Sequence, residues 1–252
     1  MDLLILKVKG KFAHFRKFYT NSSSLSYSVP PRTTVIGLLA AVLGYERDSY
    51  YELFPKDKFN VSVKKDSCIR KVMQSVNYIK ATSPKNIFQP KDHTQIPVEI
   101  LTGDDGVGYT IYINCADKNL MDELELRVKN NKYVYSPYLG AAPFNCSFQF
   151  CRRLDIEPEK NSELIRISTP VNLKDVVSGS IDIFENDNLK LLKERMPVEF
   201  LKGREVGNMA SYIYDENGHP LKLKLNTEFI KLEDENIAVS YTHLRAHETE
   251  LH

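Results

Sequence analysis

The first extended segment of the chain sets the tightest limit on its fold. Residues 3–6 are leucine and isoleucine, so apolar side chains fall on both faces of a strand until Lys7 interrupts them. A strand that is apolar on both faces lies in the middle of a sheet whose two faces are covered. We therefore expect residues 2–9 to form a central strand that is buried on both faces at its start.

A polar, aromatic-rich loop and a helix follow this strand. Residues 11–29 show little periodicity, and long ordered loops in compact domains are usually functional. The double proline at residues 30–31 enforces an extended backbone, after which Thr33 or Thr34 is expected to cap an apolar helix. Gly44 supplies the left-handed residue that ends this helix.

The next elements alternate between strands and a helix. We predict strands at residues 59–64 and 69–79, a proline-punctuated stretch at 81–97, a strand at 109–114, a helix begun by Asp117 or Asn119, and a strand at 132–135. The residues expected to point inward from the first two of these strands are Val61, Val63, Val72, Val76 and Tyr78. The order β-α-β-β-α-β is that of the ferredoxin-like fold, the plan that RNA recognition modules use.

Beyond residue 145 the sequence is rich in short strands. Residues 146–154 and 164–169 are expected strands, and residues 212–214 and 221–225 flank an Asn-Gly pair that favours a tight hairpin. We therefore predict an α+β fold with a ferredoxin-like domain at residues 1–145 and a small β-rich part at 146–238. Residues 239–252 resemble a translated sequencing adapter, and we exclude them from the fold as non-native.

Composition excludes several other classes of protein. Of the 252 residues, 42% are hydrophobic and 27% are charged, as in ordinary globular proteins. The longest apolar run is too short to cross a bilayer, and the first residues lack the basic start of a secretory signal, so we expect a cytoplasmic protein with no membrane partner. The cysteines include no C-x-x-C pair, and we predict no disulfide framework, metal site or other cofactor.

Charge is distributed unevenly along the chain. Residues 1–101 hold 16 Lys and Arg against 8 Asp and Glu, whereas residues 102–252 hold 18 against 25. A basic half suggests an anionic partner, and the acidic half argues against a uniform positive coat. A solvated surface on which the two halves mix in space explains the same numbers equally well.

Several segments of the chain together resemble one known family. The most specific is Gly-Lys-Phe-Ala-His-Phe-Arg-Lys-Phe at residues 10–18 with the double proline and apolar helix at 30–44, because these features occur in a fixed order. The segments at residues 93–101 and 138–144 agree with it, and a weaker match covers 196–204 and 212–214. In this arrangement the chain closely resembles the fifth family of CRISPR-associated (Cas) proteins, a branch of the RAMP superfamily, in its type I-B form.

The resemblance implies a subunit of Cascade, the type I CRISPR surveillance complex of antiviral defence. The family member caps the repeat-derived 5′ handle of the crRNA, using a ferredoxin-like domain, a long β-hairpin thumb and a small C-terminal β part. Residues 81–97 stand where the thumb would project. The implied partners are the crRNA handle, the backbone subunits and large subunit of the complex and, through the complex, target DNA. We therefore expect a noncatalytic RNA-binding protein.

Candidate residues follow from what single-stranded RNA requires, namely cations for phosphates, flat faces for bases and closely approaching backbone. The phosphate candidates are Arg16, Lys17 and Arg32, and the stacking candidates are Phe15, Tyr19 and Tyr27. The amides at Thr33 and Thr34 offer an anion site, and Gly140 offers close backbone approach. In the thumb region, Lys80, Lys85 and Lys91 are expected to follow phosphates and Phe88 to wedge between bases. Each candidate also has a plainer alternative. The lysines could be solvated surface residues, and Arg32 could brace the loop by pairing with a carboxylate. The aromatic rings could belong to the core, and Gly140 could form a simple turn.

Two other functions remain open at this point. The alternative is a metal-independent endoribonuclease that processes precursor crRNA, since one branch of the same family cuts RNA with a tyrosine, a lysine and a histidine. Tyr45 could stand for that tyrosine, but His93 offers only a loose substitute for the lysine and histidine. Lone histidines such as His14 and His93 are more often hydrogen-bonding residues than catalysts. The third function is an interaction domain that does not bind RNA.

Overall fold

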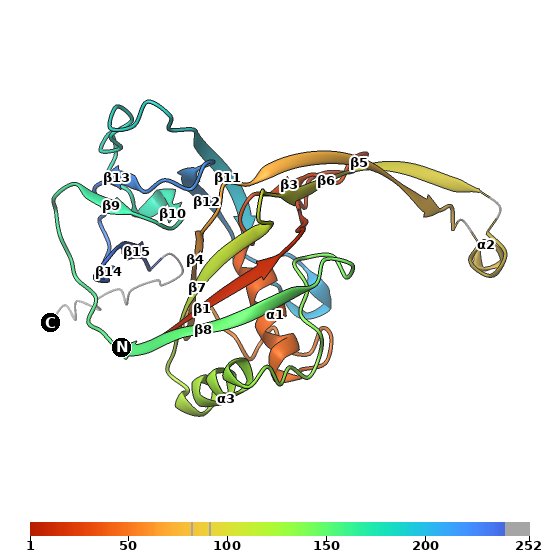
Figure 1. Ribbon diagram of the computed structural model, residues 1–252, viewed down its shortest axis with the longest axis horizontal. Helices are drawn as coiled ribbons and strands as arrows, with labels where there is room; N and C mark the ends of the chain where they lie inside the picture. The colour runs from red at the N-terminus through yellow and green to blue at the C-terminus, as the bar shows by residue number, and fades with distance from the viewer. Residues whose placement is uncertain (82, 91, 240–252) are drawn as a thin grey trace, which may run out of the picture.

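The predicted central strand lies inside the first sheet of the molecule. The structure is a computed structural model that describes residues 1–81, 83–90 and 92–239. Here β1 (Asp2–Gly10) lies in an antiparallel sheet of order β4-β7-β1-β8, between β7 (Val107–Cys115) and β8 (Cys146–Asp155), with β4 (Phe59–Lys65) beyond β7 (Figure 1). The prediction of a central strand is confirmed.

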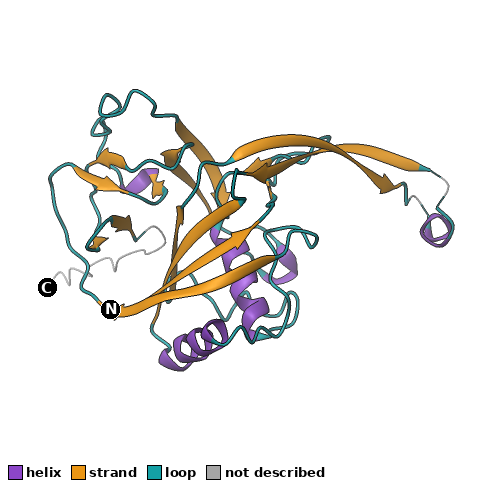
Figure 2. Ribbon diagram, in the orientation of Figure 1, coloured by secondary structure: helices purple, strands orange, loops and turns teal. Residues whose placement is uncertain are grey.

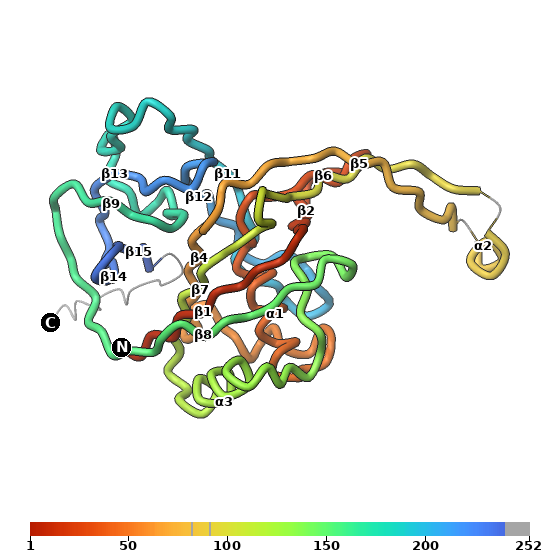
Figure 3. The backbone as a smooth tube through the Cα atoms, in the orientation of Figure 1, coloured from red at the N-terminus to blue at the C-terminus, as the bar shows by residue number. Residues whose placement is uncertain are grey.

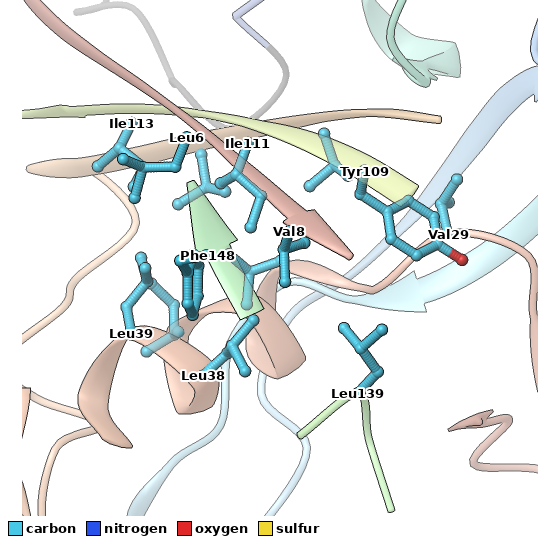
Figure 4. Packing of buried hydrophobic residues seen from close by; sticks show 14 of the residues in the cluster. Leu6, Val8, Val29, Leu38, Leu39, Tyr109, Ile111, Ile113, Leu139 and Phe148 are labelled. Atoms are coloured by element: carbon cyan, nitrogen blue, oxygen red, sulfur yellow. The ribbon is translucent and has the colours of Figure 1, made fainter. Parts of the chain in front are cut away.

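Two helices, α1 (Arg32–Leu43) and α3 (Lys118–Lys129), pack against one face of this sheet. Figure 4 shows Val8 of β1 and Phe148 of β8 beside Leu38 and Leu39 of α1. Burying side chains of this size stabilises the layer by roughly 1.5–3 kcal/mol each. Gly44 ends α1 in the left-handed region with φ 89°, as predicted.

The opposite face of β1 is covered near its start. Leu3 and Ile5 pack there against Ile230 of β14 (Phe229–Lys231) and Ile237 of β15 (Asn236–Ala238). Lys7, the next residue on this face, is exposed. The change from apolar residues to lysine along β1 therefore marks where the C-terminal strands stop covering the sheet.

Two smaller sheets follow in the C-terminal part of the described chain, with the orders β10-β12-β11 and β13-β9-β15-β14 (Figure 2). Their remaining strands are β9 (Ile165–Ile167), β10 (Val171–Asn172), β11 (Leu191–Pro197), β12 (Met209–Asp215) and β13 (Leu221–Leu223), with 3₁₀ turns at Leu173–Asp175 and Lys202–Arg204. The predicted α+β class is confirmed, with many short strands after residue 155.

A two-stranded arm projects from the body of the molecule (Figures 1 and 3). In it, β5 (Arg70–Ile79) pairs with β6 (His93–Thr102), and α2 (Pro84–Phe88) lies at the outer end. The strand expected at residues 69–79 is confirmed, whereas residues 81–97 form only the outer part of the arm. Val72 and Tyr78 are 48% and 52% exposed, so the prediction that they point inward is wrong. Both residues belong to the arm, in which β5 pairs with β6 and does not pack against the body of the molecule.

Two local predictions near the helices are wrong. Residues 132–135 form no strand; the amides of Val134 and Tyr135 instead donate to the carbonyls of Val42 and Ala41 at the end of α1. The sheet position predicted for them belongs to β8, which begins at residue 146, so the first sheet extends past the predicted boundary at residue 145. At the other end of α1, Pro31 occupies the N-cap position, and neither Thr33 nor Thr34 caps the helix.

The hairpin predicted across residues 212–225 is also wrong. Its turn forms, with Gly218 at φ 89° and its amide bonded to the Asp215 carbonyl. However, β12 pairs with β11 and β10, and β13 pairs with β9. Pro220 follows the turn and has no N–H to donate to a hairpin ladder, and the buried Asp215 carboxylate binds the amides of Lys190 and His219, which redirects the chain.

In the described part of the chain, each helix is much shorter than the roughly 20 residues that a membrane-crossing helix requires.

Candidate nucleic-acid interface

A groove of about 320 Å³ lies where several distant parts of the chain meet. Its walls come from β2 (Phe15–Arg16), the first turns of α1, the loop after α1, the loop at residues 138–140, and residues 200–204. Four residues predicted to bind RNA meet in this groove, namely Arg16, Thr33, Thr34 and Gly140. The fold therefore brings together segments that the sequence separates by more than a hundred residues.

Gly140 forms the closest backbone contact in the groove wall. It has φ 82°, and a Cβ added there would lie 2.0 Å from the carbonyl oxygen of His14. Only glycine fits both the left-handed backbone and this approach. The prediction that Gly140 allows close backbone approach is confirmed, with the backbone of residue 14 as the neighbour.

The start of α1 forms the floor of the groove. Thr33 is buried and Thr34 is half-buried, and the Thr34 amide donates to the Pro31 carbonyl at 2.9 Å. One turn later, a Cβ on Gly37 would lie 2.9 Å from Tyr50 Oη. The small residue at this position therefore lets the Tyr50 side chain lie directly against the helix.

Arg16 and Lys17 are adjacent in sequence but face different surroundings. Arg16 is exposed at the groove, where its guanidinium donates to the Thr20 carbonyl at 3.3 Å. Lys17 instead turns inward and forms an ion pair with the carboxylate of Glu194 on β11. Burial disfavours the charged ammonium, but the hydrogen bond and the charge of Glu194 leave the pKa of Lys17 above its ordinary value. The prediction that Lys17 binds phosphate is wrong, because Glu194 already holds it inside the protein.

The two tyrosines of the loop also differ. Tyr27, on β3 (Ser26–Tyr27), is fully buried, and its hydroxyl donates to the Arg195 carbonyl at 2.7 Å. Burial raises the pKa of this hydroxyl. The prediction that Tyr27 stacks on a base is therefore wrong. Tyr19 is 54% exposed and lies edge-on to Phe18, and it is not among the residues that line the groove.

Arg32 is a structural residue. It is 2% exposed, and its guanidinium donates to the carbonyls of Val198, Phe54 and Phe59 at 3.1, 2.9 and 2.8 Å. The prediction that Arg32 binds phosphate is wrong. The alternative was a bracing role through a carboxylate; the hydrogen bonds described above give Arg32 a bracing role through backbone carbonyls.

Sequence reasoning missed the aromatic and cationic side chains on the other walls of the groove. These are Tyr50, Tyr51, Tyr138, Phe200 and Arg204. Tyr51 lies edge-on to Phe200, with ring centroids 5.8 Å apart, and links two walls. Burial and a hydrogen bond to Asp48 raise the pKa of Tyr51. Two features of the sequence could have indicated these residues. The segments 138–144 and 196–204, which carry the family resemblance, contain Tyr138, Phe200 and Arg204, and a cluster of aromatic and charged residues directly follows Gly44.

The predicted thumb residues lie at the outer end of the arm, away from the groove (Figure 1). Lys80 and Lys85 are exposed, and Phe88 is 85% exposed. Lys91 lies outside the described residues. The two predicted sets of RNA-binding residues therefore form two separate surfaces.

His14 connects the groove to the base of the arm. Its Nδ1–H donates to the Glu99 carbonyl of β6 at 2.7 Å, and its Nε2 accepts from the Ser24 hydroxyl at 2.8 Å. Both bonds are satisfied by the neutral ring, and burial lowers the pKa of His14 below its ordinary value. The interpretation of this histidine as a hydrogen-bonding residue is confirmed.

We expect this histidine to make stability depend on pH. Below about pH 6.5 the unfolded chain takes up a proton at His14 that the folded chain resists, so the free energy of unfolding falls, by at most about 1.4 kcal/mol per pH unit. Above that pH, the neutral His14 contributes its full share to the free energy of unfolding. Urea titrations between pH 7.5 and 5 should show this fall in the wild type and a shallower fall in His14→Gln. Parallel curves for the two proteins would contradict it.

The residues considered for RNA cleavage lie in different places. Tyr45 follows α1 and packs against the core, with its ring edge-on to Phe54 at 5.7 Å. His93 is exposed at the start of β6, opposite Ile79 near the end of the arm. The fold thus separates this tyrosine from this histidine.

Comparison with known proteins agrees with the family resemblance. Residues 3–100 match the family described as CRISPR-associated protein (Cas_Cas5). No curated protein matches the chain. Among solved structures, a CRISPR protein from Archaeoglobus fulgidus is similar at 10% identity and TM-score 0.56, over 94% of this chain and 98% of that one. A chain of the type III-B Cmr-beta complex bound to cognate target RNA and AMPPnP is similar at 11% identity and TM-score 0.50, over 88% of this chain and 86% of that one.

The solved structures show a shared fold over nearly the whole molecule. The family match carries further information, because residues 3–100 include most of β1, the aromatic loop, α1 and most of the arm. These are the parts that build the groove floor and connect it to the arm. By this match, residues 3–100 are similar to the Cas5 family of CRISPR-associated proteins, and the solved structures show that the fold of a CRISPR protein extends over nearly the whole molecule.

Proposed function

We propose that the chain is a noncatalytic subunit of a type I CRISPR surveillance complex (Cascade), and that it holds the 5′ handle of the crRNA. The observation that carries this proposal is the groove. It joins Arg16 and Arg204, which suit phosphates, to the rings of Tyr50, Tyr138 and Phe200, on which unstacked bases can lie.

The arrangement of the first sheet supports the same proposal. Its elements follow the order β1, α1, β4, β7, α3 and β8, and its strand order is β4-β7-β1-β8. We assign this unit to the ferredoxin-like fold, in which a β-α-β-β-α-β chain forms an antiparallel sheet with both helices on one face. We further propose that the arm is the family's thumb, and that backbone subunits, the large subunit and target DNA are met through the complex.

Binding and cutting are separated by one experiment. The full chain is incubated with labelled CRISPR repeat RNA in EDTA and examined on native and denaturing gels. Shifted, uncut RNA is the expected result. A discrete metal-independent cut would instead favour the endoribonuclease, and RNA that is neither shifted nor cut would contradict binding by this chain.

The groove itself is tested by removing its two arginines. Arg16→Ala with Arg204→Ala should weaken RNA binding about tenfold or more. It should also lower the slope of log affinity against log salt by about 1.4, because two phosphate contacts with a single strand are lost. Filter-binding titrations at several salt concentrations measure both quantities.

A matched control removes the same charge elsewhere. Arg166 and Lys231 lie in a C-terminal sheet, and both are exposed. Arg166→Ala with Lys231→Ala should change affinity by less than about twofold, as expected for a distant surface. Equal losses in the two double variants would mean that net charge, and not the groove, governs binding.

A further inference from the structure

Two residues beside the groove share an unusual backbone conformation. Asp48 and Arg204 both have φ 64°, and in the described chain Asn131 is the one other non-glycine residue with positive φ. Side chains disfavour this region, and residues held there cluster at functional sites. Asp48 lies in the loop after α1 and Arg204 ends a 3₁₀ turn, so two independent loops place these residues together.

The Asp48 carboxylate collects donors from both loops. Its Oδ1 lies 3.4 Å from Arg204 Nε and accepts a hydrogen bond of 2.5 Å from Tyr51 Oη. Its Oδ2 lies 3.5 Å from Arg47 Nε. Two guanidinium groups and a hydroxyl converge on one anionic group, which is the donor set that also binds phosphate.

This ion pair differs from the structural arginine pairs of the molecule. Arg204 and Arg47 keep 54% and 81% of their side-chain surface exposed, and Asp48 keeps 38%. Arg153, in contrast, is 19% exposed and is held by Asp2 and two further carboxylates. An exposed pair adds little to stability, so the fold does not require Arg204 to stay on Asp48. Arg204 and Tyr51 also line the groove.

We propose that Arg204, Tyr51 and Arg47 form a phosphate site that the chain's own Asp48 occupies until RNA binds. A phosphate of the RNA then replaces the carboxylate as the partner of Arg204. Asp48 competes with RNA for this site and thereby sets the affinity of the groove. This inference rests on the proposed function, because the competing phosphate belongs to the RNA held in the groove.

Asp48→Asn tests the competition with little disturbance. Asparagine tolerates the left-handed backbone, and its amide oxygen still accepts from Tyr51, but it has no charge to hold Arg204. We expect the variant to bind labelled repeat RNA about two- to fivefold more tightly than the wild type, the range that an exposed ion pair supports. In an Arg204→Ala background, Asp48→Asn should give no gain.

Glu185→Gln is the matched control. Arg166 is 69% exposed and pairs with Glu185 at 2.5 Å, so this variant frees an arginine and removes a negative charge far from the groove. Its RNA affinity should equal that of the wild type. Equal gains in the two variants would assign the effect to net charge and overturn the proposal.

The remaining outcomes are also decisive. Unchanged or weaker RNA binding by Asp48→Asn, with normal binding by the wild type, overturns the competition and leaves the proposed function intact. A gain that persists without Arg204 overturns the assignment of that residue. If neither the wild type nor any variant binds RNA, the proposed function fails, and the phosphate site fails with it.

Discussion

Arg32→Ala lowers the free energy of unfolding by about 3 kcal/mol or more, the largest stability effect that we expect from a single substitution in this chain. The wild-type guanidinium is almost inaccessible to water and bonds to three backbone carbonyls. Removing it leaves these buried acceptors without their partner and leaves a cavity beside the start of α1. Urea unfolding, followed by circular dichroism, measures the change.

The loss should also reach the groove. Arg32 ties the first turn of α1 to residue 198, two residues before Phe200 in the groove wall. RNA binding should therefore weaken in Arg32→Ala even at temperatures where the variant is folded. Arg166→Ala, at an arginine 69% exposed, should stay within about 0.5 kcal/mol of the wild type. A loss below about 1 kcal/mol in Arg32→Ala would contradict a bracing role.

Gly140→Ala should have the second largest effect, because it combines two penalties. Alanine resists the observed φ of 82°, and its Cβ would collide with the His14 carbonyl, which belongs to rigid backbone. The loop at 138–140 must then move away from residue 14 and open one wall of the groove. We expect a stability loss of about 2–3 kcal/mol and a marked loss of RNA affinity.

Gly179→Ala separates these two penalties. Gly179 also has a positive φ, 73°, but a Cβ there meets no atom within 4 Å. This variant therefore carries the backbone cost alone, about 1 kcal/mol, and should keep full RNA affinity. If the two glycine variants lose equal stability and both bind RNA normally, the close approach of residues 140 and 14 does not shape the groove.

Local patterns predicted elements that depend on nearby residues. The two-faced apolar pattern at the start of β1 and the glycine stop at Gly44 both appear where the sequence placed them, because strand alternation and helix termination are set within a few residues. The hairpin across residues 212–225 failed although its turn formed correctly. A turn sequence sets the conformation of four residues, but not which strands pair beyond it.

The site residues failed for one shared reason. Lys17, Tyr27 and Arg32 all turn inward toward residues 194–198, through Glu194, the Arg195 carbonyl and the Val198 carbonyl. The cationic and aromatic side chains of the sequence are present as expected. However, nothing in the sequence indicates that residues 194–198 pack against the segment that carries them. The predicted residues that do reach the groove are Arg16, Thr33, Thr34 and Gly140.

The position of β1 in its sheet has a consequence during synthesis. This strand leaves the ribosome before both of its neighbours, because Leu4 pairs with Ile113 and Lys9 with Ser147. At roughly 5–20 residues per second, its first neighbour is complete at least about 5 s later. Pairings so distant in sequence slow folding, and an unpaired apolar strand is a template for aggregation. The nascent chain therefore depends on keeping its first strand shielded until β8 has emerged.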